Sequence, residues 1–157
     1  MRHELLDYQQ RAVGNVISAL DRRPILVSPT GSGKTLMATA LVEQLRMPTL
    51  WLAHRKELID QAAQRLEDHG LVCGIIMAGY TPMPLAQVQV ASVQTLIRRD
   101  KPQAEIVIID ECHHATADSY QSIIDAYPTS RIVGLTATPF RLDGRGLGDL
   151  FGELVIA

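Results

Sequence analysis

A glycine-rich turn between an apolar run and a helix-like run constrains the fold of this chain more than any other feature. Residues 25–27 are Ile-Leu-Val, residues 28–35 read SPTGSGKT, and an alanine- and leucine-containing segment follows. A short buried strand, a glycine turn and a helix N-terminus together direct backbone N–H groups and the positive helix end at one point. This arrangement predicts a phosphate-binding loop and a nucleoside triphosphate as its ligand.

Two residues of this loop have clear chemical roles. Lys34 can reach the β- and γ-phosphates, and the Thr35 hydroxyl can hold Mg²⁺. The usual pattern, G-x-x-x-x-G-K-[ST], has glycine where this chain has Ser28, but that departure leaves the working parts in place. The remaining residues expected to surround the phosphates are Pro29, Thr30, Gly31, Ser32 and Gly33.

The second motif is an apolar run that ends in two acids. Residues 106–109 are Ile-Val-Ile-Ile, and Asp110 and Glu111 follow them. Such a run is typical of a strand buried on both faces of a parallel sheet, and it places the acids at the edge where open α/β sheets bind ligands. Asp110 is predicted to hold Mg²⁺ through its water shell, and Glu111 to orient and deprotonate the attacking water.

Cys112, His113 and His114 follow the two acids and raise zinc as an alternative. Three adjacent side chains cannot all face one ion without a strained backbone, and Cys73, the other cysteine, has no C-x-x-C partner. We therefore expect Mg²⁺ and no other metal. Two isolated cysteines also suit a reducing compartment better than a disulfide framework.

The sequence Asp110-Glu111-Cys112-His113 resembles the DExH box of superfamily 2 helicases and translocases. Further segments resemble motifs of that superfamily in the family order: Tyr8-Gln9, residues 52–58, residues 91–96 and residues 135–141. The DECHH box together with LTATPFR is most similar to the group of type III restriction helicase subunits and RadD-like bacterial repair helicases. The resemblance implies a RecA-like P-loop NTPase lobe of the α/β class, with a mostly parallel sheet sandwiched by helices.

The resemblance also implies roles for residues outside the phosphate loop. Gln9 would read the adenine edge, and His113 would couple the state of the γ-phosphate to Thr136 and Thr138. Contacts with a nucleic-acid backbone are implied for His54, Arg55, Ser92, Gln94 and Thr95. The implied cofactors are ATP and Mg²⁺. The implied activity is ATP hydrolysis coupled to movement along nucleic acid, with DNA as the leading candidate, although DNA and RNA present the same phosphates.

Length limits the chain to one such lobe. Its 157 residues, of which 46% are hydrophobic, can bury one sizeable α/β core. The resemblance to superfamily 2 motors implies two such lobes with ATP between them. We therefore expect residues 1–157 to form the first lobe of a helicase ATP-binding domain and the second lobe to lie elsewhere in the same polypeptide. Without the arginine finger of that lobe, hydrolysis should be weak. A nuclease or methyltransferase subunit is a candidate partner.

Composition and charge predict a cytoplasmic protein. A formal net charge of −2 argues against a strongly basic protein that coats nucleic acid, so phosphate contacts would depend on local clusters such as residues 54–56. The N-terminus lacks the apolar segment of a signal peptide, and no apolar run approaches membrane-spanning length. We expect no membrane association.

Apolar periodicity predicts alternating helices and strands. Helices are expected near residues 7–20, 34–46, 55–69, 92–98 and 117–126. Strands are expected near residues 25–27, 49–53, 73–77, 88–91, 106–110 and 131–135. The glycine-rich residues 143–148 should lead toward the second lobe. This alternation favours a parallel sheet covered on both faces.

Two other functions stay open on the residues alone. One is a P-loop ATPase that does not act on nucleic acid, which would leave residues 54–56 and 92–95 without a role. The other is a nucleotide-binding module without turnover. The presence of Lys34, Thr35, Asp110 and Glu111 argues against that module, because a structural lobe would need none of them.

Overall fold

A computed structural model describes residues 3–31, 33–114, 118–137 and 150–157. The strands in these residues are β1 (Pro24–Val27), β2 (Thr49–Ala53), β3 (Cys73–Ile76), β4 (Val88–Ser92), β5 (Ile106–Ile109), β6 (Arg131–Thr136) and β7 (Glu153–Ile156). They form one sheet in the order β3-β4-β2-β5-β6-β1-β7. Each pair of neighbours in that described sheet is parallel.

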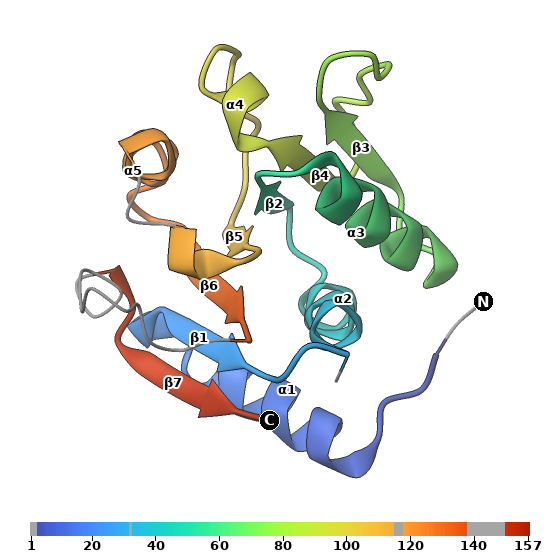
Figure 1. The fold of residues 1–157 in the computed structure, drawn as a ribbon, viewed down its shortest axis with the longest axis vertical. Coiled ribbons are helices and arrows are strands. Elements are labelled where there is room, and N and C mark those ends of the chain that lie inside the picture. Colours follow the sequence, from blue (N-terminus) through green and yellow to red (C-terminus); the bar gives the residue numbers. More distant parts are fainter. Residues whose placement is uncertain (1–2, 32, 115–117, 138–149) are drawn as a thin grey trace.

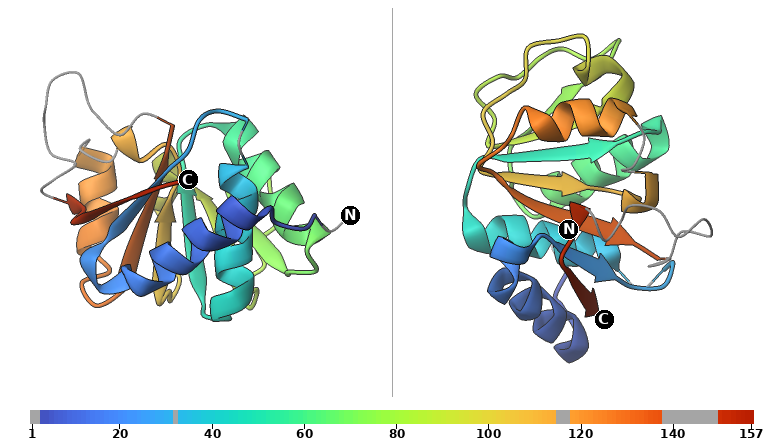
Figure 2. Two further views of the ribbon diagram at one scale, coloured as in Figure 1. Left: turned by 90° about the horizontal axis from the view of Figure 1, so that it is seen from below. Right: turned by 90° about the vertical axis from the view of Figure 1, so that its left-hand side faces the viewer.

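Helices cover both faces of the sheet (Figure 1). The helical elements are α1 (Asp7–Ser18), η1 (Leu20–Arg22), α2 (Lys34–Leu45), α3 (Lys56–Asp68), α4 (Val93–Leu96), η2 (Cys112–His114) and α5 (Asp118–Asp125). The first three α-helices lie on one face, and α4 and α5 lie on the other (Figures 1 and 2). The parallel sheet between two helical layers confirms the predicted fold class. Among the described helices, none has both the length and the apolar character needed to cross a membrane.

The sheet separates two apolar cores. Met37, Trp51 and Leu66 are fully buried on the face covered by α1, α2 and α3. Leu50 and Ile123 are fully buried on the opposite face. All residues of β2 and β5 are buried, as expected for central strands of a parallel sheet. Each large apolar side chain buried in this way contributes about 1.5–3 kcal/mol to folding.

The direction of the strands determines where functional residues gather. Because the strands are parallel, their carboxyl ends share one edge of the sheet. The phosphate loop follows β1 and the two acids follow β5, with β6 between these two strands. The predicted nucleic-acid residues follow β2 and β4, which are also neighbours.

Several predicted elements differ from the structure. The first helix ends at Ser18, and the turn η1 follows it. The helix expected over residues 92–98 is the short α4. Strand β7 was not predicted, although it pairs with β1 through Ile25 and Leu154. Residues 143–148 lie outside the described residues.

Candidate functional site

The phosphate loop begins as a continuation of β1. The Ser28 N–H donates to the carbonyl oxygen of Thr136 at 3.1 Å, and Ser28 is fully buried. Gly31 and Gly33 have φ angles of 84° and 88°, a region that glycine adopts without steric cost. Turns of this kind point successive N–H groups into an anion-binding concavity. Since Gly33 precedes α2 and has no side chain, no side-chain cap occupies the first-turn amides of that helix.

Lys34 closes the loop from the helix side. Its Nζ donates to the carbonyl oxygen of Ser28 at 3.0 Å, so the side chain crosses the turn. The Thr35 carbonyl oxygen accepts a hydrogen bond from the Thr39 hydroxyl at 2.8 Å. The loop therefore combines glycine-dependent turns, a helix N-terminus and a lysine, which are the features that a triphosphate requires.

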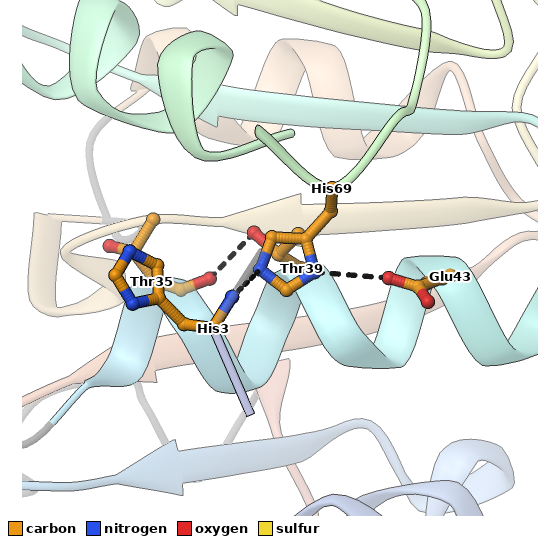
Figure 3. A network of polar contacts seen from close by, with 5 residues as sticks. All are labelled: His3, Thr35, Thr39, Glu43 and His69. Carbon is orange, nitrogen blue, oxygen red and sulfur yellow. Dashed lines mark hydrogen bonds and ion pairs between the residues drawn. The ribbon is translucent and has the colours of Figure 1, made fainter. Parts of the chain in front are cut away.

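A polar network fixes α2 against the end of α3 (Figure 3). Glu43, two turns beyond Thr35, lies with its Oε2 3.1 Å from Nδ1 of His69, whose side chain is 3% exposed. The His3 backbone N–H donates to Nε2 of the same ring at 3.5 Å. Because Nε2 accepts this hydrogen bond, Nδ1 is the nitrogen that donates to Glu43. The helix that carries Lys34 and Thr35 is thereby joined to α3 and to the N-terminal segment.

Gln9 packs directly against the phosphate loop. Its side chain is buried, and its Oε1 accepts the Leu6 N–H at 2.9 Å. A Cβ atom added to Gly33 would lie 2.7 Å from Gln9 Nε2, which is closer than real Cβ contacts. The structure thus places the predicted adenine-reading residue beside the loop, where a Cβ atom at position 33 would displace the end of its side chain.

Asp110 lies at the end of β5 with its carboxylate buried. Its N–H donates to the Leu52 carbonyl oxygen at 2.9 Å, and its Oδ2 accepts the Trp51 indole N–H at 3.4 Å. Burial raises the pKa of Asp110 to about 6, and Glu111 adds to this, whereas the Trp51 hydrogen bond and the Lys34 charge oppose it. A cation bound at this carboxylate would favour its ionised form.

Glu111 and His113 connect the ends of β5 and β6. Glu111 has a φ of 53°, a left-handed conformation that non-glycine residues seldom adopt. His113 Nε2 lies 3.5 Å from Glu111 Oε2, and Nδ1 lies 3.2 Å from the Thr136 hydroxyl oxygen. Thr136 is fully buried at the end of β6. The predicted coupling pair of His113 and Thr136 is therefore in contact.

Cys112 points away from this chain of contacts into the core. It is fully buried, and a Cβ atom added to Gly134 would lie 2.8 Å from its Sγ. Burial raises the pKa of the Cys112 thiol to about 12. The side chain therefore has the environment of an inert core residue and not of a metal-binding thiolate.

The residues predicted to contact nucleic acid are also connected. Ser92 Oγ donates to Gln94 Oε1 at 3.0 Å, and Gln94 Nε2 donates to the His54 carbonyl oxygen at 3.4 Å. Thr95 follows on α4 and is partly buried, and Arg55 is exposed immediately before α3. The structure thus brings the ends of β2 and β4 together through the Gln94 side chain.

The basic cluster predicted at residues 54–56 is weaker than expected. Burial, and next the neighbouring Arg55, lower the pKa of His54 below its ordinary value, which disfavours the charged imidazolium. Lys56 forms an ion pair with Asp60 at 2.7 Å. Arg55 is therefore the member of this cluster best suited to meet a phosphate.

Two predicted site residues, Ser32 and Thr138, lie outside the described residues. One residue at the site was missed altogether. Trp51 touches Asp110 only because β2 and β5 are neighbours in the sheet, and sequence patterns do not reveal strand order.

Comparisons with known proteins agree with this geometry. The sequence profile of the type III restriction enzyme res subunit matches residues 2–141. IRC3 of Saccharomyces cerevisiae, named as a candidate ATP-dependent helicase, is 36% identical over 96% of this chain. The DNA 3'-5' translocase XPB2 of Sulfurisphaera tokodaii is 31% identical over 90% of it. This chain spans 26% of the first relative and 32% of the second.

A solved structure gives the same result for the fold. The UvsW helicase from bacteriophage T4 superimposes with a TM-score of 0.81 and 26% sequence identity. The superposition covers 99% of this chain and 61% of the UvsW chain.

Proposed function

The chain belongs to the family of type III restriction enzyme res subunits, and on that premise we propose that it is the ATP-binding lobe of a nucleic-acid-dependent ATPase motor. The observation that carries this proposal is that the phosphate loop after β1 and the buried carboxylate of Asp110 after β5 lie at the same edge of one parallel sheet. A phosphate loop and a carboxylate at the same sheet edge suit a triphosphate with a divalent cation.

Each polar residue of the site has a role in the proposed hydrolysis. Lys34 and the amides of residues 29–33 hold the phosphates. Thr35 and Asp110 would hold Mg²⁺, in part through water, and the bound ion would supply positive charge beside the phosphates. Glu111 orients the attacking water, and Gln9 faces the adenine. Lys34 must exchange its bond with the Ser28 carbonyl oxygen for one with the phosphates.

Coupling to a second lobe completes the proposal. His113 transmits changes at Glu111 to Thr136 and onward to Thr138. The relatives are about three to four times longer than this chain, so we place the second lobe and its arginine in the remainder of the same polypeptide. Hydrolysis stays slow without that arginine.

The proposed nucleic acid is DNA, which this lobe contacts at the sugar-phosphate backbone. Arg55 meets a phosphate, while Ser92, Gln94 and Thr95 supply neutral hydrogen bonds beside it. His54 supports Gln94 through its carbonyl oxygen. A restriction-type family also makes a nuclease or methyltransferase subunit a candidate partner, and we propose a cytoplasmic location.

Nucleotide binding tests the first part of this proposal. The 157-residue chain is titrated with a fluorescent ATP analogue in the presence and absence of Mg²⁺. Lys34→Ala should weaken binding at least about tenfold, since it removes a charged hydrogen-bond donor. Lys56→Ala is the matched control, because Lys56 is exposed on α3 and paired with Asp60. Equal binding by native chain and Lys34→Ala would contradict the proposed phosphate site.

DNA binding tests the second part. Fluorescence anisotropy with labelled single-stranded DNA should show affinity that falls as salt rises. Arg55→Ala and Gln94→Ala should weaken binding, whereas Arg98→Ala, an exposed cation outside the motif, should change it less. Equal losses of DNA affinity in all three variants would indicate diffuse charge attraction and not the proposed DNA-binding site.

A further inference from the structure

The chain contains one tryptophan, and its indole N–H touches the proposed magnesium carboxylate. Trp51 lies in the centre of β2 and is fully buried. In the ladder between β2 and β5, Trp51 stands opposite Ile108. Asp110 lies two residues beyond Ile108, on the same face of the sheet, because side chains alternate along a strand.

The surrounding residues allow the indole to reach this carboxylate. Leu52 stands opposite Ile109, so Ala53 is next to Asp110 at the end of the ladder. Ala53 has a small side chain and is fully buried. The large ring of Trp51 therefore extends diagonally along the strand, with Nε1 3.4 Å from Asp110 Oδ2.

We propose that Trp51 is a positioning residue for the metal site, whose indole N–H holds one oxygen of Asp110 and so limits the carboxylate to one orientation. The inference rests on the proposed ATP·Mg²⁺ function. Indole is a donor with no acceptor, so it can orient a carboxylate without competing for a cation. A carboxylate that binds a metal works best when its own orientation is held by a neighbouring hydrogen bond.

A purely apolar role for Trp51 makes a different prediction. Buried tryptophan normally needs an acceptor for its N–H, and any nearby oxygen would serve that need. If Trp51 served only to pack the core, loss of its N–H would lower stability and would affect nucleotide binding equally with and without Mg²⁺. If it positions Asp110, the loss should act on the magnesium-dependent part of binding.

The first measurement is spectroscopic. Because Trp51 is the one tryptophan, the ¹⁵N-labelled chain has one indole N–H signal, and intrinsic fluorescence reports on the same residue. With a non-hydrolysable ATP analogue already bound, addition of Mg²⁺ should shift this signal. The Asp110→Asn variant should lose most of that shift.

The second measurement separates orientation from packing. The affinity for the analogue is measured with and without Mg²⁺ in the native chain, in Trp51→Phe and in Leu50→Val. Trp51→Phe should reduce the gain from Mg²⁺ about tenfold, the low end for partners of metal ligands because the bond is long. Metal-free binding should change less than about twofold. Leu50→Val, a fully buried control on the other face of β2, should leave both unchanged.

A shape-matched substitution keeps the proposal testable if Trp51→Phe does not fold. Growth with the benzothiophene analogue of tryptophan replaces the ring N–H with sulfur at residue 51 alone. It should reproduce the loss of Mg²⁺-dependent affinity. An equal gain from Mg²⁺ in the native and substituted chains would overturn the role of Trp51 and leave the proposed function standing. No gain in the native chain would overturn the proposed metal site and this inference with it.

Discussion

His113 lies between two strands with its Nδ1 3.2 Å from the hydroxyl oxygen of Thr136. The other ring nitrogen lies 3.5 Å from the carboxylate of Glu111. One imidazole therefore contacts both the acid that follows β5 and the last residue of β6. A change at either contact alters the position of the same ring.

A double-mutant cycle tests this contact. His113→Ala, Thr136→Val and the double variant are unfolded in urea, and the free energies of unfolding are compared. The two side chains should show a coupling energy of about 0.5–1.5 kcal/mol, the usual net value of one hydrogen bond. Strictly additive losses would mean that the contact contributes nothing to the fold.

Gly33 and Gly31 provide a matched pair of glycine substitutions. Both have left-handed φ angles, so alanine at either position should cost about 1–2 kcal/mol of unfolding free energy. Only Gly33 has a close neighbour, because Cβ would meet Gln9 Nε2 at 2.7 Å, whereas nothing lies within 4 Å of a Cβ at Gly31. Because Gln9 Nε2 is at the end of a flexible side chain, Gly33→Ala should cost only about 0.5–1.5 kcal/mol more, the cost of moving the Gln9 side chain off its rotamer.

The control for this prediction is the pair of Gly33→Ala and Gln9→Ala. Shortening Gln9 removes the atom that the new methyl group meets, so the double variant should recover the additional loss. Equal stability of Gly31→Ala and Gly33→Ala in a urea titration would show that the Gln9 contact is unimportant.

The raised pKa of Asp110 predicts how stability depends on pH. Burial moves this pKa from an ordinary value of 3.8 to about 6. The folded chain therefore holds the proton more tightly than the unfolded chain does, and stability falls as pH rises through 6. The loss is at most about 3 kcal/mol, the equivalent of two pKa units.

Asp110→Asn isolates this effect, because asparagine has the same shape and does not titrate in this range. The variant should gain stability relative to the native chain as pH rises from about 4.5 to about 7.5, a range that includes most of the carboxyl titration, with the difference measured by urea unfolding at each pH. A native chain that gains stability over the variant across this range would have the opposite sign and contradict the assignment.

Both cysteines should be unreactive in the folded chain. Burial raises the pKa of Cys73 to about 11 and that of Cys112 to about 12, so the reactive thiolate is scarce at pH 8. We expect modification by an aromatic disulfide reagent to be at least about 100-fold slower than in urea, followed by absorbance. Rapid modification of one thiol in the folded chain would show that its core position opens readily.

The sequence predicted most strongly those features that depend on local pattern. The continuous apolar residues identified β5, and the glycine turn before α2 identified β1. The two motifs also indicated the sheet edge at which these strands end. The contact between His113 and Thr136 also followed, because it was implied by a family resemblance in which both motifs recur.

Features that depend on strand order and packing could not be predicted. β7 was missed because it has only four residues, of which Leu154 and Ile156 are exposed. Its identity as a strand comes from pairing with β1. The Gln9–Gly33 contact similarly depends on how α1 lies against the loop. The lowered pKa of His54 depends on its burial, which its position after a strand does not reveal.

The sheet order also defines a border inside the molecule. Residues proposed for the nucleotide follow β1, β5 and β6, and those proposed for DNA follow β2 and β4. These two sets of strands are neighbours at one ladder, between β2 and β5. Two hydrogen bonds cross this ladder here: the Trp51 indole N–H donates to the Asp110 carboxylate, and the Asp110 N–H donates to the Leu52 carbonyl oxygen. The nearest strands of the two sets are thus neighbours, about 4.8 Å apart. Within this lobe, a structural change that passed from the proposed nucleotide site to the proposed DNA site would have to cross that ladder or move the loops that follow these strands.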